Sequence, residues 1–158
     1  MEEWKKYKEY QISSWGNVKG KFGRLMKPAK TTRGYLQVNI YEEGVVKKML
    51  VHRLVALCFL DNPDNKEFVD HIDGNILNNK VENIRWATKS QNCMNRVKAS
   101  NNTSGYKGVC WNKQHQKWMA MIHLNGNNKY LGLYNTAEEA STAYVKASRE
   151  LFKDFSRV

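Results

Sequence analysis

A chain of 158 residues with 41% hydrophobic residues can form one ordinary domain or two to three small modules. Its longest apolar run, residues 54–60, is too short to span a bilayer, and the charged residues 1–10 lack the apolar core of a secretory signal. Three cysteines without a C-x-x-C pair argue against a disulfide framework and a zinc ribbon, and they fit a reducing cytosol: Cys58, Cys93 and Cys110.

The net charge of +11 indicates a polyanionic partner, most often a nucleic acid, although it also fits simple solubility. Residues 1–50 carry 11 basic against 5 acidic side chains, residues 51–100 carry 7 against 6, and residues 101–158 carry 8 against 4. Basic arms therefore flank a nearly neutral centre, a layout that suits a protein gripping phosphates on both sides of a metal-dependent site.

The first 60 residues predict a β-rich module followed by a helix. The alternation of residues 35–40 and 45–51 around a Glu-Glu-Gly turn predicts a hairpin. The compact apolar run 52–60 predicts a helix that ends before Pro63. Further along, a short helix is expected from about Lys89, with Thr88 or Ser90 as its N-cap.

The C-terminal third predicts three strands and one helix. A polar linker at residues 98–104 precedes three strand-like runs. These runs cover residues 106–112, 117–124 and 129–134. A long amphipathic helix follows, with Thr136 as N-cap and Glu139 completing a capping box.

The segment VDHIDGNILNN, residues 69–79, concentrates polar chemistry in the middle of the chain. With Gly74 at the sixth position of an EF-hand loop, the twelfth position would need a glutamate, but Lys80 stands there. The calcium-loop interpretation therefore fails, and Asp73 with Gly74 is expected to form a turn. His52 is expected to be a buried or helix-capping histidine rather than a ligand.

A ββα arrangement explains the same segment better. If a strand ends at His71 and the chain returns along residues 84–87, a helix from about Lys89 would carry Asn92 back beside Asp70. Two oxygen ligands with several open positions suit Mg²⁺ or a similar hard cation that also holds a substrate phosphate. They do not suit zinc, for which thiolates or several imidazoles would be expected.

The runs VHRLVALCFL and VDHIDGNILNNKVENIRWATKSQNCMNR closely resemble HNH endonucleases of the homing and phage type, in the branch whose last motif residue is asparagine. The resemblance implies that His71 is the general base that deprotonates the attacking water. It also implies that Asp70 and Asn92 bind one Mg²⁺ or Mn²⁺ per active centre, and that Asn83 holds the loop and helps to fix the base. A neutral imidazole is a suitable base near pH 7.

The first 40 residues resemble the small nuclease-associated modular motif that precedes the nuclease core in this family. Its basic side chains are expected to contact DNA phosphates: Lys19, Lys21, Arg24, Lys27, Lys30 and Arg33. The apolar residues of this segment could equally form a minicore with the lysines on its solvated face, and both interpretations can hold.

Residues 104–152 resemble the APETALA/ethylene-response-factor type of DNA-binding domain. That fold is a three-stranded antiparallel sheet backed by a helix, and the sheet enters the major groove. The expected DNA contacts are Lys107, Trp111, Lys113, Lys117, Trp118 and Lys129. Trp118 could instead belong to the core. Cys110 and Asn112 stand where plant members usually have arginine, so base preference stays open.

The sequence thus predicts an α+β protein with a central ββα-metal nuclease core at residues 51–97. A β module, residues 1–50, precedes this core, and the DNA-binding domain, residues 105–158, follows linker 98–104. The expected activity is metal-dependent cleavage of double-stranded DNA at a preferred extended site, with nicking the simpler outcome for one centre per monomer. Neither a membrane nor a protein partner is expected, and the location is the cytoplasm, that of the host cell if the gene belongs to a phage.

Two other function classes stay open. One is a DNA-binding regulator with a vestigial nuclease centre, against which the intact set of Asp70, His71, Asn83 and Asn92 speaks. The other is an RNA-binding protein, and the lack of an exposed aromatic signature typical of RNA-recognition sheets counts only weakly against it.

Overall fold

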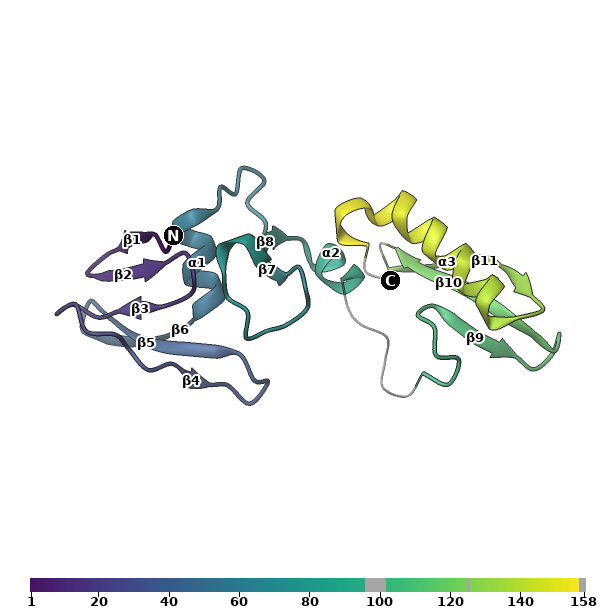
Figure 1. The fold of residues 1–158 in the computed structure, drawn as a ribbon, viewed down its shortest axis with the longest axis horizontal. Coiled ribbons are helices and arrows are strands. Elements are labelled where there is room, and N and C mark those ends of the chain that lie inside the picture. Colours follow the sequence, from purple (N-terminus) through teal and green to yellow (C-terminus); the bar gives the residue numbers. More distant parts are fainter. Residues whose placement is uncertain (96–101, 125, 157–158) are drawn as a thin grey trace. The chain divides into compact units, whose positions relative to one another are not determined.

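The computed structural model describes residues 1–95, 102–124 and 126–156 (Figure 1). The chain forms two compact units, Met1–Thr88 and Lys89–Val158. Both units combine small antiparallel sheets with few helices, so the predicted mixed α and β character is confirmed. No helix in the part of the chain that the structure describes is long and apolar enough to cross a membrane.

The N-terminal half of the first unit contains two three-stranded antiparallel sheets. The first consists of β1 (Trp4–Tyr7), β2 (Tyr10–Ser13) and β3 (Val18–Lys19). The second consists of β4 (Ala29–Lys30), β5 (Leu36–Glu42) and β6 (Val45–Leu50). The predicted hairpin is confirmed as β5 and β6, whose register pairs Asn39 with Lys48. Val38 and Ile40 point inward on alternate positions, as expected for a sheet with one buried face.

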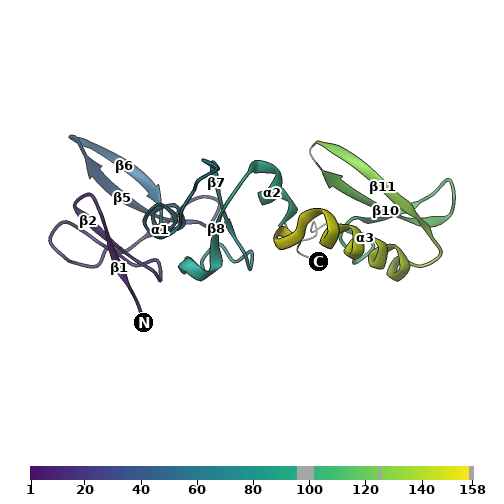
Figure 2. The same ribbon diagram turned by 90° about the horizontal axis from the view of Figure 1, so that it is seen from above.

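Helix α1 (Val51–Phe59) agrees with the helix predicted at residues 52–60. It lies between the N-terminal sheets and the hairpin formed by β7 (Phe68–His71) and β8 (Ile84–Ala87), as Figures 1 and 2 both show. The helix and the sheets share one hydrophobic core, whose completely buried members include Ile12, Ile40, Val51, Leu54 and Val55. Residues on both sides of position 50 are therefore packed as a single body.

The strands β7 and β8 are joined by a loop of nine residues, 72–80, and the short 3-10 helix η1 (Val81–Asn83). The register pairs His71 with Ile84 and Asp70 with Arg85. The polar segment singled out in the sequence thus begins on the last three residues of β7 and continues into a long loop.

The second unit starts with α2 (Lys89–Met94), which directly follows Thr88. Its sheet has the order β11-β10-β9 and is antiparallel throughout, with strands β9 (Val109–Asn112), β10 (Lys117–Leu124) and β11 (Asn127–Tyr134). Helix α3 (Ala137–Phe152) packs on it and is followed by η2 (Lys153–Phe155). The predicted capping box is confirmed: Thr136 accepts from the Glu139 amide, and the Glu139 carboxylate accepts from the Thr136 amide.

Helix α2 packs within the second unit, where Met94 contacts a cluster built on Ile122, Tyr144 and Phe152. The division between the units, at Thr88, falls inside the residues predicted to form the nuclease core, 51–97. Residues 96–101, which hold the end of the predicted short helix and most of the predicted linker, lie outside the described part of the chain. The predicted domain boundaries at 50, 97 and 104 stay predictions.

Candidate active site

Strand β7 carries Asp70 and His71 into a buried position at the end of the hairpin. Their exposed fractions are only 4% and 5%. Arg85, directly across on β8, donates from Nε to Asp70 Oδ2 over 2.9 Å. The aspartate predicted to bind a cation is thus already held by a guanidinium. Arg85 was not singled out in the sequence, and only the register of the two strands identifies it as a neighbour.

The His71 ring is held by an asparagine of the following loop. Nε2 of His71 lies 3.1 Å from Oδ1 of Asn79, a residue only 4% exposed. The Asn79 amide nitrogen donates to the carbonyl of Leu77, which leaves the amide oxygen facing the imidazole. An oxygen acceptor there favours the tautomer with hydrogen on Nε2, so the lone pair of the neutral ring resides on Nδ1. The sequence alone did not identify Asn79 as the partner of His71.

Two further rings pack beside the imidazole of His71. His52, in the first turn of α1, meets it edge to face with a centroid separation of 4.8 Å. The ring centre of Tyr35 lies 5.2 Å from that of His52. His52 is buried, as the sequence predicted, and Nδ1 of its ring lacks a hydrogen-bond partner among the residues that the structure describes. Burial, reinforced by the nearby His71 and Arg53, lowers the pKa of His52 to about 4. His52 is therefore a neutral ring at pH 7.

The buried His52 predicts a loss of stability in mild acid. The unfolded histidine titrates near its ordinary pKa of 6.5, so between pH 6.5 and pH 4 the unfolded state binds more protons. Stability is retained above pH 6.5 and falls as the pH drops towards 4. We expect His52 to account for a decrease of about 2 kcal/mol in the free energy of unfolding between pH 7.5 and pH 5.

Urea denaturation of the wild type and of His52→Gln at the two pH values measures this contribution. The variant should lose less stability than the wild type on acidification. An identical pH dependence in both proteins would show that His52 is not the group responsible.

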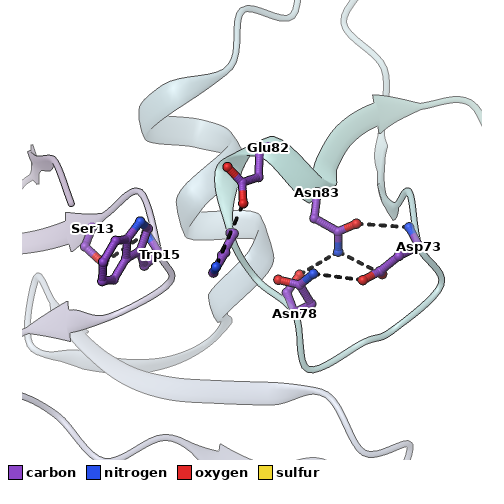
Figure 3. A network of polar contacts seen from close by, with 7 residues as sticks. Ser13, Trp15, Asp73, Asn78, Glu82 and Asn83 are labelled. Carbon is purple, nitrogen blue, oxygen red and sulfur yellow. Dashed lines mark hydrogen bonds and ion pairs between the residues drawn. The ribbon is translucent and has the colours of Figure 1, made fainter. Parts of the chain in front are cut away.

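The loop after His71 is organised by Asn83 and Asp73 (Figure 3). The Asn83 oxygen accepts from the Asp73 amide at 2.9 Å, and its nitrogen donates to Asp73 Oδ1 at 2.9 Å and to the Asn78 carbonyl at 2.8 Å. Burial opposes ionisation of Asp73, but hydrogen bonds from Asn78, the Asn75 amide and Asn83 outweigh it and lower its pKa. The side chain of Asn83 thus ties the two ends of the loop together.

The predicted turn at Asp73 and Gly74 is confirmed. The Gly74 amide donates to the His71 carbonyl at 2.8 Å, and Gly74 adopts the left-handed φ of +66°. Asp73 directs its carboxylate to its own loop through the bonds just given, as expected for a turn residue.

Asn92, the second predicted metal ligand, lies half-buried on α2 in the second unit. Its approach to Asp70 therefore stays a prediction. Within the described ranges there is no group of three or more His, Cys, Asp or Glu side chains that could hold a metal. The donor at hand, the Asp70 carboxylate, is a hard oxygen ligand, which fits a cation such as Mg²⁺ that keeps most of its waters.

Most N-terminal candidates for DNA contact are exposed. Lys21, Arg24, Lys27, Lys30 and Arg33 all face solvent, whereas Lys19 is half-buried. The ammonium group of Lys19 lies 3.9 Å from the ring centre of Trp4, and that of Lys21 pairs with Glu9. An exposed ion pair of this kind contributes little to the free energy of folding, so Lys21 can exchange Glu9 for a DNA phosphate.

The register of the C-terminal sheet sorts the remaining candidates by face, because residues paired across strands share one side. Trp111 pairs with Trp118, and Trp118 packs on the cluster that includes Ala120 beneath α3. Lys129 pairs with Ile122 and so projects on the same side.

Lys117, by contrast, pairs with Asn112 on the opposite face. Exposed Tyr130 joins that face beyond a β-bulge and was not singled out in the sequence. Lys113 is exposed in the β9–β10 turn, and Lys107 donates from Nζ to the Met94 carbonyl at 2.8 Å.

Comparisons with known proteins identify relatives of this chain. A family model described as HNH endonuclease matches residues 49–94. The chain is 37% identical to DNA endonuclease I-HmuI of Bacillus phage SP01, over 60% of this chain and 58% of that protein. It is 39% identical to an uncharacterized HNH endonuclease of Acanthamoeba polyphaga mimivirus, over 56% of this chain and 27% of that protein.

A third relative, Protein 3.8 of Escherichia phage T7, is 33% identical over 57% of this chain and 74% of its own length. A solved structure titled "DNA binding and cleavage by the HNH homing endonuclease I-HmuI" aligns with a TM-score of 0.56 and 28% identity. That alignment covers 96% of this chain and 91% of the solved one. The chain spans less than two thirds of the length of I-HmuI and of the mimivirus endonuclease.

Proposed function

The chain belongs to the HNH endonuclease family, and from this membership we propose that it is a divalent-metal-dependent DNA endonuclease of the homing type. The observation that carries the proposal is the buried histidine of β7, next to a buried carboxylate and hydrogen-bonded through Nε2 to Asn79. An imidazole oriented through one nitrogen can take a proton at the other, which is what a general base for water requires.

In the proposed reaction, Nδ1 of His71 takes the proton of a water that attacks a backbone phosphate in line. The water oxygen bonds to phosphorus while the bond from phosphorus to the 3′ oxygen breaks, and the leaving 3′ oxygen takes a proton from solvent. The products are a 5′-phosphate and a 3′-hydroxyl. Asn79 keeps the ring in the tautomer that can accept this proton, and Asn83 keeps the loop that carries Asn79 closed. With one centre per chain, one strand is cut in each event.

We propose that Asp70, together with Asn92, holds one Mg²⁺ or Mn²⁺ per active centre. When bound, such a cation supplies positive charge to the phosphate as negative charge develops on it. The hard carboxylate oxygens of Asp70 support this assignment. A carboxylate can accept from Arg85 with one oxygen and bind a cation with the other.

Recognition of an extended DNA site is proposed for both arms. The first 40 residues, as a nuclease-associated modular motif, offer exposed cationic side chains for phosphates. Residues 105–158, as an APETALA/ethylene-response-factor-like domain, offer a three-stranded sheet, a shape that enters the major groove. The similarity to phage and viral nucleases supports a phage or similar mobile gene whose product acts in the cytoplasm of the host cell.

A supercoiled plasmid tests the proposal. With Mg²⁺, purified protein should convert it to nicked circles, and excess EDTA should abolish conversion because the proposed cation is removed. Gel electrophoresis separates supercoiled, nicked and linear forms. DNA binding without cutting in the presence of Mg²⁺ or Mn²⁺ would instead support the alternative, a DNA-binding regulator with a vestigial centre.

A further inference from the structure

The turn between β2 and β3 lies against the loop that holds His71. Gly16, in this turn, approaches Asn79 so closely that a Cβ built on the glycine would lie 2.8 Å from Asn79 Cβ and 3.2 Å from its carbonyl oxygen. Gly16 also has a φ of +87°, which disfavours any other residue. The absence of a side chain here allows the turn to touch Asn79 directly.

The turn itself is held firmly. Ser13 is completely buried, and its Oγ accepts from the Asn17 amide at 2.8 Å and from the Trp15 amide at 3.3 Å, the latter contact visible in Figure 3. The Ser14 carbonyl accepts from the Val81 amide at 2.7 Å. A hydrogen bond and a close packing contact therefore join the turn to the stretch from Asn79 to Val81.

A second N-terminal turn meets the same loop. A Cβ on Gly34, which precedes β5, would lie 3.1 Å from the Ile76 side chain. Tyr35, the next residue, lies with its ring centre 6.1 Å from that of His71. Residues assigned by sequence to a DNA-gripping module thus surround the loop that positions the base.

We propose that the β2–β3 turn, residues 13–17, is a positioning element of the nuclease centre, which sets Asn79 through Gly16 and so fixes the orientation and tautomer of His71. The proposal rests on the proposed function, since it assigns a role in the same reaction. The chain of contacts is short: Gly16 touches Asn79, and Asn79 Oδ1 bonds His71 Nε2. The N-terminal module then acts on the rate of cutting as well as on binding.

A small displacement of Asn79 is enough to matter. The 3.1 Å contact between Asn79 Oδ1 and His71 Nε2 is near the long end of the usual range, so a shift of several tenths of an ångström weakens it. Without that acceptor, either ring nitrogen can carry the hydrogen, and the fraction of rings ready to accept a proton at Nδ1 falls. Misplacement of about 1 Å can cost about 100-fold in rate, so a loss of about tenfold is expected here.

The test compares Gly16→Ala with Gly44→Ala. Gly44, in the β5–β6 turn, has a matching φ of +81° but no heavy atom within 4 Å of a built Cβ, so it reproduces the backbone strain without the collision. Gly16→Ala should slow single-turnover nicking by about tenfold, whereas Gly44→Ala should stay within about twofold of the wild type. Fluorescence anisotropy with labelled duplex DNA in EDTA should show unchanged binding for both.

Nuclear magnetic resonance of the histidine ring nitrogens provides a readout that does not depend on cutting. The His71 signal, identified by its loss in His71→Ala, should show hydrogen on Nε2 in the wild type and in Gly44→Ala. It should show a mixture of tautomers in Gly16→Ala. Should Gly16→Ala not fold, Ser13→Ala loosens the same turn without adding bulk and should shift the signal in the same direction.

The outcomes separate the two proposals. A wild-type protein that never cuts DNA but whose His71 tautomer changes in Gly16→Ala removes the proposed function and keeps the positioning role. An unchanged His71 signal and nicking rate in Gly16→Ala, or in Ser13→Ala if that variant replaces it, overturns the positioning role. Equal losses in Gly16→Ala and Gly44→Ala also overturn it, because strain alone then accounts for the effect.

Discussion

Replacing His71 with alanine should lower the single-turnover rate of DNA nicking by about 10²–10⁴-fold, the range that a general base contributes. DNA binding should persist, because the imidazole is buried and no proposed phosphate contact depends on it. The plasmid assay measures the rate, and anisotropy with labelled duplex measures the binding.

A matched control makes this result specific to the position. His115 is an exposed histidine in the turn between β9 and β10, outside the proposed centre, and His115→Ala should nick at the wild-type rate. Free imidazole added to His71→Ala should restore part of the activity, because the cavity left by the ring can admit a small base. Equal nicking by wild type and His71→Ala would remove His71 from the mechanism.

Local sequence patterns predicted the parts of the fold that depend on local interactions. The β5–β6 hairpin, helix α1 and the capping box at Thr136 each follow from residues a few positions apart, and the structure confirms all three. The turn at Asp73 and Gly74 belongs to the same class, since glycine supplies the left-handed conformation without steric cost.

Interactions between segments far apart in the chain could not be predicted from the sequence. The sequence offers three asparagines in the loop, at positions 75, 78 and 79, and nothing in their spacing says which one turns inward to His71. Arg85 becomes the partner of Asp70 only once the strands are in register. The role of Gly16 could not be predicted from local sequence either, because its contact with Asn79 joins residues 63 positions apart.

The sequence alone also could not assign every residue of the C-terminal sheet to its face. Alternation along a strand predicts two faces, but a β-bulge shifts the count by one residue. The register shift between Ala120 and Met121 pairs Met121 with Tyr130. Tyr130 therefore joins the face opposite α3, whereas Lys129 pairs with Ile122 on the other. DNA contacts by Trp111, Trp118 and Lys129 stay predictions. Lys117 and Tyr130 lie on the sheet face opposite α3, which is the face available to a DNA groove.

Replacing Asp70 with asparagine should have two separable effects. Nicking should fall by at least about 100-fold, because the proposed cation loses its carboxylate ligand and with it several kcal/mol of charge stabilisation. The free energy of unfolding should also fall, by about 3 kcal/mol, because the guanidinium of Arg85 loses a carboxylate partner that is almost completely buried. Urea denaturation and single-turnover nicking measure the two effects independently.

A second substitution distinguishes the structural effect from the chemical one. In the double variant Asp70→Asn with Arg85→Gln, no charge is left at the pair, so much of the lost stability should return while nicking stays lost. Glu82→Gln, which removes an exposed carboxylate 3.9 Å from Lys80, should change stability by less than about 0.5 kcal/mol. If nicking returned together with stability in the double variant, Asp70 would be a structural partner of Arg85 and the cation would have to be held by other oxygens. If stability alone returned, the carboxylate of Asp70 would have a role in the reaction that its pairing with Arg85 cannot explain.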